Sequence, residues 1–127
     1  MDEVKIVLAV SGWRGLSGPE ARRLVGEALT EFATRNGKPH VIVTGGARGA
    51  DQLAEAWARR KGIHVVTLRP KRTRSRGEAC AECLARNTDI VKMGTHLLAF
   101  PSELGSGTQD AIHKAIALGK PVKVVNV

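Results

Sequence analysis

Short apolar segments alternate with segments of helical periodicity along the whole chain, and this alternation restricts the fold more than any other feature. The apolar segments, typical of strands buried on both faces, span residues 4–10, 40–44, 63–68, 96–100 and 122–127. Between them, apolar residues recur at helical spacing in segments that begin near residues 19, 50, 78 and 108. Strands that alternate with helices form parallel sheets, and right-handed crossovers place the helices on both faces. The order predicts an α/β fold: a doubly wound, Rossmann-like, parallel five-stranded sheet in one domain over 1–127.

The chain carries a large excess of positive charge. It has 20 Lys and Arg against 12 Asp and Glu, which gives a formal net charge of +8. This balance favours anionic partners such as nucleic acid, nucleotides or other phosphates. A basic segment follows the third predicted strand and contains Arg69, Lys71, Arg72, Arg74 and Arg76. It has three interpretations: a solvated loop, a lid over a polyanionic small ligand, or a binding surface for a nucleic-acid backbone.

Membrane and secretory features are not found in the sequence. No apolar run approaches the roughly 18 residues of a membrane span, and the N-terminus lacks the basic start and cleavage site of a secretory peptide. We therefore expect a cytoplasmic protein with no membrane partner. The chain has no Tyr, two Phe and two Trp, which disfavours a sheet that stacks single-stranded bases. Trp57 shares helical spacing with apolar neighbours and is expected in the core.

Three of the predicted strand-to-helix loops are rich in glycine. They are Ser11-Gly12-Trp13-Arg14-Gly15, Gly45-Gly46-Ala47-Arg48-Gly49-Ala50-Asp51 and Gly105-Ser106-Gly107-Thr108. In a doubly wound sheet all three lie at the carboxyl edge, where ligands bind. Glycine lets backbone N–H groups approach a phosphate, helix N-termini add positive potential, and arginine binds phosphate oxygens in pairs. A single such loop is equally explained as a tight turn, but three at one edge favour a phosphate-bearing ligand.

Two residues in these loops have alternative roles. Asp51 is suited to accept a hydrogen bond from a ribose hydroxyl or to cap the second helix. Trp13 is suited to stack on a ligand base or to pack against the neighbouring loop. The loops match neither the P-loop ending Gly-Lys-Ser/Thr nor the dinucleotide fingerprint GxGxxG, so we expect no cofactor.

Cysteine and histidine are interpreted as structural. Cys80 and Cys83 are three apart on a predicted helix and supply only half of a zinc site, so we expect them in the core and expect no metal. The alternative is a zinc ion shared across a dimer. The four histidines lie at strand starts or on a helix, away from the predicted ligand edge; they are His40, His64, His96 and His113.

The segment TGGARGAD at 44–51, the pair Arg86-Asn87 and the segment AFPSELGSGT at 99–108 resemble the SLOG superfamily. This group includes the DNA-processing protein DprA/Smf and the LOG cytokinin-activating enzymes, and the chain is most similar to its small YspA/YpsA-like branch. The resemblance implies a Rossmann-like fold that binds nucleotides or nucleotide-derived ligands, often as a homodimer. With the glycine-rich loops it predicts these ligand-binding residues: Ser11, Gly12, Trp13, Arg14, Gly45, Gly46, Arg48, Gly49, Asp51, Arg86, Asn87, Pro101, Gly105, Ser106, Gly107 and Thr108.

The chain departs from the LOG pattern at the catalytic position. That pattern places a glutamate three residues after the threonine, where this chain has Ala111, with Asp110 one residue earlier. Arg86, Glu103 and Asp110 are the candidates that remain for catalysis. We therefore expect binding of a nucleotide or nucleotide-derived phosphate, for sensing or sequestration. The alternatives are a LOG-like phosphoribohydrolase of nucleoside monophosphates and a sequence-nonspecific nucleic-acid-binding protein that uses the basic segment.

Overall fold

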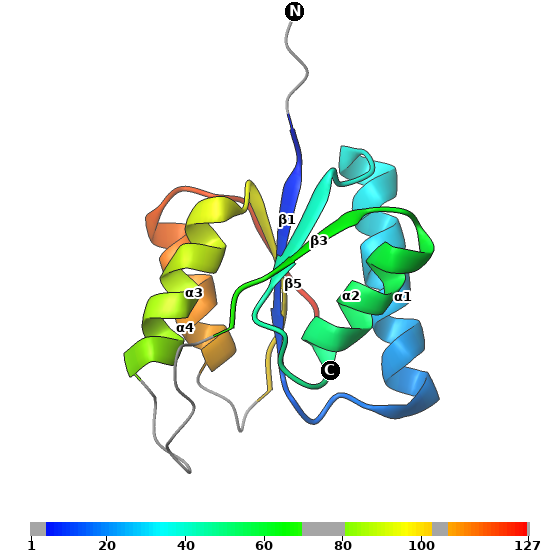
Figure 1. Ribbon diagram of the computed structural model, residues 1–127, viewed down its shortest axis with the longest axis horizontal. Coiled ribbons are helices and arrows are strands. Elements are labelled where there is room, and N and C mark those ends of the chain that lie inside the picture. Colours follow the sequence, from blue (N-terminus) through cyan, green and yellow to red (C-terminus); the bar gives the residue numbers. More distant parts are fainter. Residues whose placement is uncertain (1–4, 70–80, 103–106, 127) are drawn as a thin grey trace, which may run out of the picture.

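The computed structural model describes residues 5–69, 81–102 and 107–126, and its helices and strands follow the predicted order (Figure 1). The strands are β1 (Val7–Gly12), β2 (Val41–Thr44), β3 (His64–Thr67), β4 (His96–Phe100) and β5 (Val122–Val124). The helices are α1 (Gly18–Asn36), α2 (Ala50–Arg60), α3 (Ala81–Met93) and α4 (Gly107–Ala117). None of these helices is long and apolar enough to cross a membrane.

The strands form one parallel sheet in the order β3-β2-β1-β4-β5. Helices α1 and α2 cover one face of the sheet, and α3 and α4 cover the other (Figure 1). The predicted α/β, Rossmann-like fold is confirmed. The order of the strands reverses between β1 and β4, because the chain crosses from β3 to the far side of β1. In such sheets ligands bind beyond the carboxyl ends of the strands, near this reversal.

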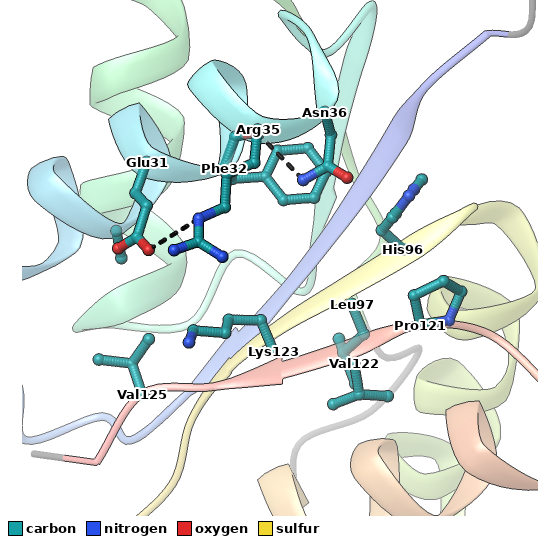
Figure 2. Close-up of a pocket in the computed structure, with 11 residues that line it drawn as sticks. Glu31, Phe32, Arg35, Asn36, His96, Leu97, Pro121, Val122, Lys123 and Val125 are labelled. Atoms are coloured by element: carbon teal, nitrogen blue, oxygen red, sulfur yellow. Dashed lines mark hydrogen bonds and ion pairs between the residues drawn. The ribbon is translucent and has the colours of Figure 1, made fainter.

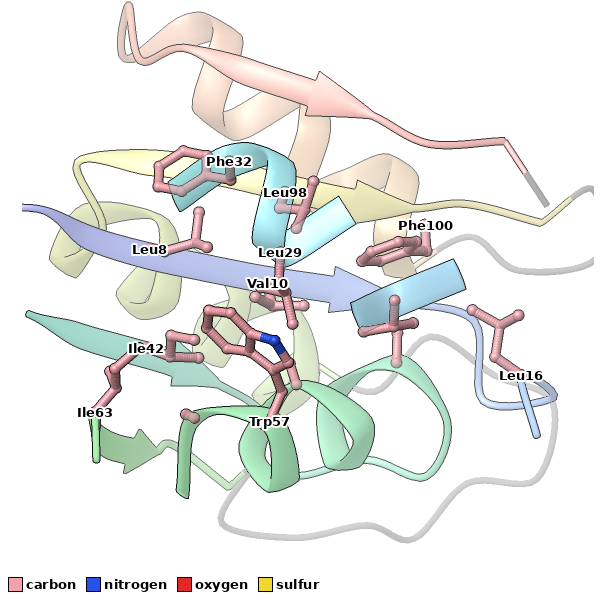
Figure 3. Packing of buried hydrophobic residues seen from close by; sticks show 14 of the residues in the cluster. Leu8, Val10, Leu16, Leu29, Phe32, Ile42, Trp57, Ile63, Leu98 and Phe100 are labelled. Atoms are coloured by element: carbon pink, nitrogen blue, oxygen red, sulfur yellow. The ribbon is translucent and has the colours of Figure 1, made fainter. Parts of the chain in front are cut away.

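Buried apolar side chains form one cluster on each face of the sheet. On the α1–α2 face, residues from alternate positions of the strands pack against Leu29, Phe32 and Trp57 (Figure 3). Val43, Ala99 and Val91 belong to the cluster on the α3–α4 face. Successive strand residues point to opposite faces, so a run that is apolar throughout supplies both clusters. The prediction that Trp57 lies in the core is confirmed, since only 6% of it is exposed.

The first strand ends later than the sequence pattern predicts. Ser11 and Gly12 belong to β1 and pair with Ala99 and Phe100 of β4, so they are not part of the following loop. Helix α2 approaches the strand closely at this point, and a side chain at Gly12 would collide with the methyl group of Ala50. The glycine that ends the apolar pattern is therefore a packing position inside the strand.

The Lys120 side chain connects the turn before β5 to the end of α3, at the amino edge of the sheet. The Lys120 ammonium donates to the carbonyl oxygens of Val91, Lys92 and Gly94 at 2.7, 2.8 and 2.6 Å, and so binds the C-terminal end of α3. Burial lowers the pKa of Lys120.

Two of the four histidines have the structural role that was expected. His40 Nδ1 accepts from the Ile6 amide at 3.0 Å, and the His96 ring packs edge-on against Phe32. His64 and His113 are exposed. The expectation for Cys80 and Cys83 concerns side chains outside the described part of the structure.

Candidate functional site

The loops that follow β1 and β2 pack directly on each other at the carboxyl edge. Gly49 has a φ of 83°, and a side chain there would collide with the backbone of Trp13 and Arg14. Only glycine allows both this left-handed conformation and this approach. The Trp13 amide also donates to the Phe100 carbonyl oxygen at 3.0 Å, which fixes the first loop against the end of β4. The structure thus brings the first two glycine-rich loops together.

Arg14 and Arg48 line one open pocket of about 550 Å³, which we call the arginine pocket. Its lining is Arg14, Gly15, Leu16, Ser17, Gly18, Arg48, Gly49, Gln52 and Leu53. Both arginines are exposed, and no residue in the described ranges forms an ion pair or hydrogen bond with either guanidinium. The pocket therefore holds two positive charges, from loops that are far apart in the sequence, and no described residue neutralises them.

Two helices begin at the arginine pocket. The residue that precedes α1 is Ser17 and the residue that precedes α2 is Gly49, and neither makes a side-chain capping hydrogen bond. The first N–H groups of a helix have no partner within the helix and carry positive potential. Glu20, in the first turn of α1, is exposed and lies 3.6 Å from Arg23. The pocket combines two helix N-termini with two arginines, an arrangement that attracts a phosphate.

The Asp51 side chain fixes the β2–α2 loop by accepting hydrogen bonds from backbone amides of that loop. Its Oδ2 accepts from the backbone N–H groups of Gly45 at 3.0 Å and Ala47 at 3.3 Å, while the Gly46 N–H donates to Thr44 Oγ1 at 3.0 Å. The amides of Gly45, Gly46 and Ala47 are thus bonded inside the protein. Any contact of this loop with a phosphate would therefore use backbone amides that follow Ala47 in the sequence. A ribose contact through Asp51 would use its other oxygen.

The second oxygen of Asp51 is buried without a partner. Among the described residues no group bonds to Oδ1, although only 5% of Asp51 is exposed. Burial raises the pKa of Asp51 to about 6, against the hydrogen bonds from Ala47 and Gly45 and the charge of Arg86, which lower it. The carboxyl consequently changes its protonation state near physiological pH.

Glu55 is a buried carboxylate that sequence reasoning missed. Its Oε2 accepts from Thr44 Oγ1 at 2.5 Å and from Thr67 Oγ1 at 2.9 Å, and its Oε1 lies 3.5 Å from Arg59. It therefore joins the ends of β2 and β3 to α2. The available signal was its position four residues after Asp51, which places both acids on one face of a helix.

Arg86 and Asn87 connect α3 to three loops. Arg86 Nη1 donates to the carbonyl oxygens of Gly45 at 3.1 Å and Leu68 at 3.4 Å, and Arg86 Nε donates to Asn87 Oδ1 at 3.2 Å. Asn87 Nδ2 donates to the Gly107 carbonyl oxygen at 3.2 Å. The pair that carries the family resemblance therefore holds the loops in place. We call the residues of this network the polar cluster: Thr44, Gly45, Gly46, Asp51, Glu55, Thr67, Arg86 and Asn87.

The catalytic candidates occupy different environments. Asp110 Oδ2 accepts from Asn87 Nδ2 at 3.1 Å and lies 2.9 Å from Lys114 Nζ, so that carboxylate oxygen already has two donors. Ala111 is buried in the core cluster of the α3–α4 face. Glu103 lies outside the described residues.

Of the remaining predicted ligand-binding residues, some are placed by the structure and others lie outside the described ranges. Trp13 packs against the core cluster of the α1–α2 face, and its ring covers Gly15. Pro101 is half-buried and Thr108 is buried. Gly105 and Ser106 lie outside the described residues.

Arg69 is the described member of the basic segment. It is exposed, and its Nη1 donates to the Gly46 carbonyl oxygen at 3.3 Å. The positions Lys71, Arg72, Arg74 and Arg76 lie outside the described part of the chain. Within the described ranges, no three His, Cys, Asp or Glu side chains gather in a way that would hold a metal ion.

Comparison with known proteins identifies the family. The chain matches the YspA, cpYpsA-related SLOG family (YAcAr) over residues 6–74. It is 35% identical over 107 residues to the Gene 61 protein of Mycobacterium phage D29, which covers 80% of this chain and 83% of the phage protein.

Solved structures share the fold at lower identity. A molybdenum cofactor binding protein from the phototrophic bacterium Rippkaea orientalis has a TM-score of 0.72 at 20% identity, over 99% of this chain and 79% of that one. DNA processing protein A from Helicobacter pylori, whose structure describes a single-stranded DNA binding mode, has a TM-score of 0.70 at 22% identity. The match covers 94% of this chain and 64% of that one. The family match spans more than half of the chain and the phage relative most of it. The chain therefore belongs to the YspA, cpYpsA-related SLOG family.

Proposed function

We propose that this protein binds a nucleotide or nucleotide-derived phosphate at the carboxyl edge of its sheet, for sensing or sequestration. The observation that carries the proposal is the arginine pocket, where Arg14 and Arg48 lack partners among the described residues and two helices begin without side-chain caps. Charge-assisted bonds from arginine and free helix N–H groups are the usual means of holding a phosphate.

The size of the pocket supports a ligand larger than inorganic phosphate. Its volume of about 550 Å³ lies within the roughly 300–1,000 Å³ that is usual for small-molecule and cofactor sites. The apolar side chains of Leu16 and Leu53 lie in the same pocket. They offer a surface for the less polar part of a nucleotide, while the arginines hold its phosphate.

A panel of ligands tests the proposal by thermal stability. AMP, ADP, ADP-ribose and ribose 5-phosphate represent the proposed class, and adenosine is the matched ligand without phosphate. We expect at least one phosphate-bearing ligand to raise the Tm in a concentration-dependent way, and adenosine to have no effect, since a ligand that binds only the folded state stabilises it.

Single arginine variants locate the site. We expect Arg14→Ala or Arg48→Ala to weaken binding about tenfold, because each removes a charge-assisted contact. Arg60→Ala, an exposed arginine at the far end of α2, is the control and should bind as the wild type does. The proposal fails if no phosphate-bearing ligand shifts the Tm up to millimolar concentration, or if both pocket variants bind normally.

Hydrolysis is a second candidate function. A LOG-like phosphoribohydrolase would use Arg86, Glu103 or Asp110, and Asp110 shares a network with Asn87 and Lys114. Release of free adenine from AMP would establish this activity. Its loss in Asp110→Asn, with retention in Glu103→Ala, would assign the carboxylate.

Nucleic-acid binding is a third candidate, supported by the single-stranded DNA binding of the structurally similar DNA processing protein A. Arg69, the described member of the basic segment, lies exposed at the carboxyl edge. Steep salt dependence of oligonucleotide binding, lost when Arg72, Arg74 and Arg76 are replaced by Gln, would support it.

We also infer a homodimer from the SLOG resemblance, which sedimentation of the full chain would test.

A further inference from the structure

A second pocket lies on the α1 side of the edge strand β5, away from the arginine pocket. Helix α4 covers β5 on one face of the sheet, while on the other face the second half of α1 leaves a cavity of about 140 Å³ beside β4 and β5 (Figure 2). We call this cavity the edge groove. It shares no lining residue with the arginine pocket.

The floor of the edge groove is apolar. Phe32 is buried, and Ala28 and Val125 are half-buried beside it, all three packed in the core cluster of the α1–α2 face. Leu97 also lines the groove, but its side chain belongs to the cluster on the α3–α4 face. A dry apolar cavity of about 150 Å³ holds a benzene ring in another protein, so the groove suits a body of that size. It is much smaller than the roughly 300–1,000 Å³ of pockets for drug-sized ligands. The floor therefore favours a small ligand with a ring-sized apolar part.

The rim of the edge groove carries one positive charge that no described residue compensates. Glu31 Oε1 lies 3.1 Å from Arg35 Nε, so these two charges neutralise each other. Lys123 projects from β5 toward that pair (Figure 2), and none of the residues that the structure describes forms an ion pair or hydrogen bond with its ammonium. His96, the other titratable lining residue, is neutral at pH 7, since burial lowers its pKa.

We propose that the edge groove binds a small amphipathic monoanion, such as an aromatic carboxylate. The ring lies against Phe32, Ala28 and Val125, and the anionic group pairs with the ammonium of Lys123. The apolar floor supplies the burial and the unpaired lysine supplies the preference for an anion. The rim carries a single net positive charge, which matches a ligand with one negative charge. A phosphate with two negative charges is better matched by the two arginines of the arginine pocket.

Two-dimensional ¹H–¹⁵N NMR of the full chain tests this proposal with three probes of similar size. Benzoate carries a negative charge, benzyl alcohol none and benzylamine a positive charge. We expect benzoate to shift the amide signals of Phe32, Leu97 and Val125 and to bind about threefold more tightly than benzyl alcohol, because an ion pair with the exposed Lys123 ammonium adds to the burial of the ring. Benzylamine should cause no saturable shift.

Variants separate the charge from the cavity. Lys123→Gln should weaken the binding of benzoate about threefold and leave that of benzyl alcohol unchanged, whereas Ala28→Leu should fill the floor and abolish the binding of both. Lys61→Gln, an exposed lysine at the end of α2, is the control. The proposal is overturned if none of the probes shifts these signals, or if the three bind equally. It is also overturned if Ala28→Leu weakens self-association, because the groove would then hold a second copy of the chain.

Discussion

The polar cluster and the arginine pocket use the same β2–α2 loop in opposite ways. In the polar cluster, Asp51, Glu55 and Arg86 are bonded to backbone or hydroxyl groups and hold three loops together. In the arginine pocket, Arg14 and Arg48 are exposed and have no partner in the part of the chain that the structure describes. Groups that are buried and bonded contribute to stability, whereas unpaired charges at a pocket are available to a ligand. The difference predicts that stability and binding can be changed separately.

The largest loss of stability is expected from Glu55→Ala. The substitution leaves the hydroxyl groups of Thr44 and Thr67 without their acceptor, which should lower the free energy of unfolding by about 4 kcal/mol. Urea unfolding measures the effect. Glu55→Gln keeps one acceptor oxygen and should lose less, and the exposed Glu27→Ala is the control. A loss below about 1 kcal/mol in Glu55→Ala would show that the polar cluster does not stabilise the fold.

The pH dependence of stability tests Asp51. Its pKa is about 6 in the folded state and 3.8 as a free side chain, so the folded protein holds this proton more tightly. The free energy of unfolding should therefore fall as the pH rises through that interval, by about 3 kcal/mol in total. Asp51→Asn cannot titrate and should lack this fall, while the exposed Asp89→Asn should retain it. Urea unfolding at pH 4, 5, 6 and 7 makes the measurement. Equal slopes for wild type and Asp51→Asn would contradict the expectation.

The smallest effect is expected when Arg14 and Arg48 are both replaced by alanine. Neither guanidinium bonds to a described residue, so the free energy of unfolding should change by less than about 0.5 kcal/mol while ligand binding is lost. Urea unfolding and the ligand panel are measured on the same preparation. A loss of stability similar to that of Glu55→Ala would remove the distinction between the two regions.

The alternation of apolar runs and helical periods was enough to predict the fold. Burial on both faces of a parallel strand leaves a direct mark in the sequence, because most residues of the strand must then be apolar. Element ends were less accurate, as at Gly12, since a glycine is compatible with a turn and with a close contact between elements. Of the predicted ligand-binding arginines, Arg14 and Arg48 line one pocket, whereas Arg86 is bonded to carbonyl oxygens, and nothing in the sequence pattern distinguished the three.

The sequence by itself determined which segments form the sheet, the edge at which the glycine-rich loops gather, and the family to which the chain belongs. Only the tertiary structure decided which polar groups find partners. The local sequence pattern determines the helices and strands and the apolar face of each one. A hydrogen bond such as that from Thr67 to Glu55 joins residues of two separate elements, and those residues come together only when the elements pack. The same reason explains the edge groove, whose lining comes from α1, β4 and β5.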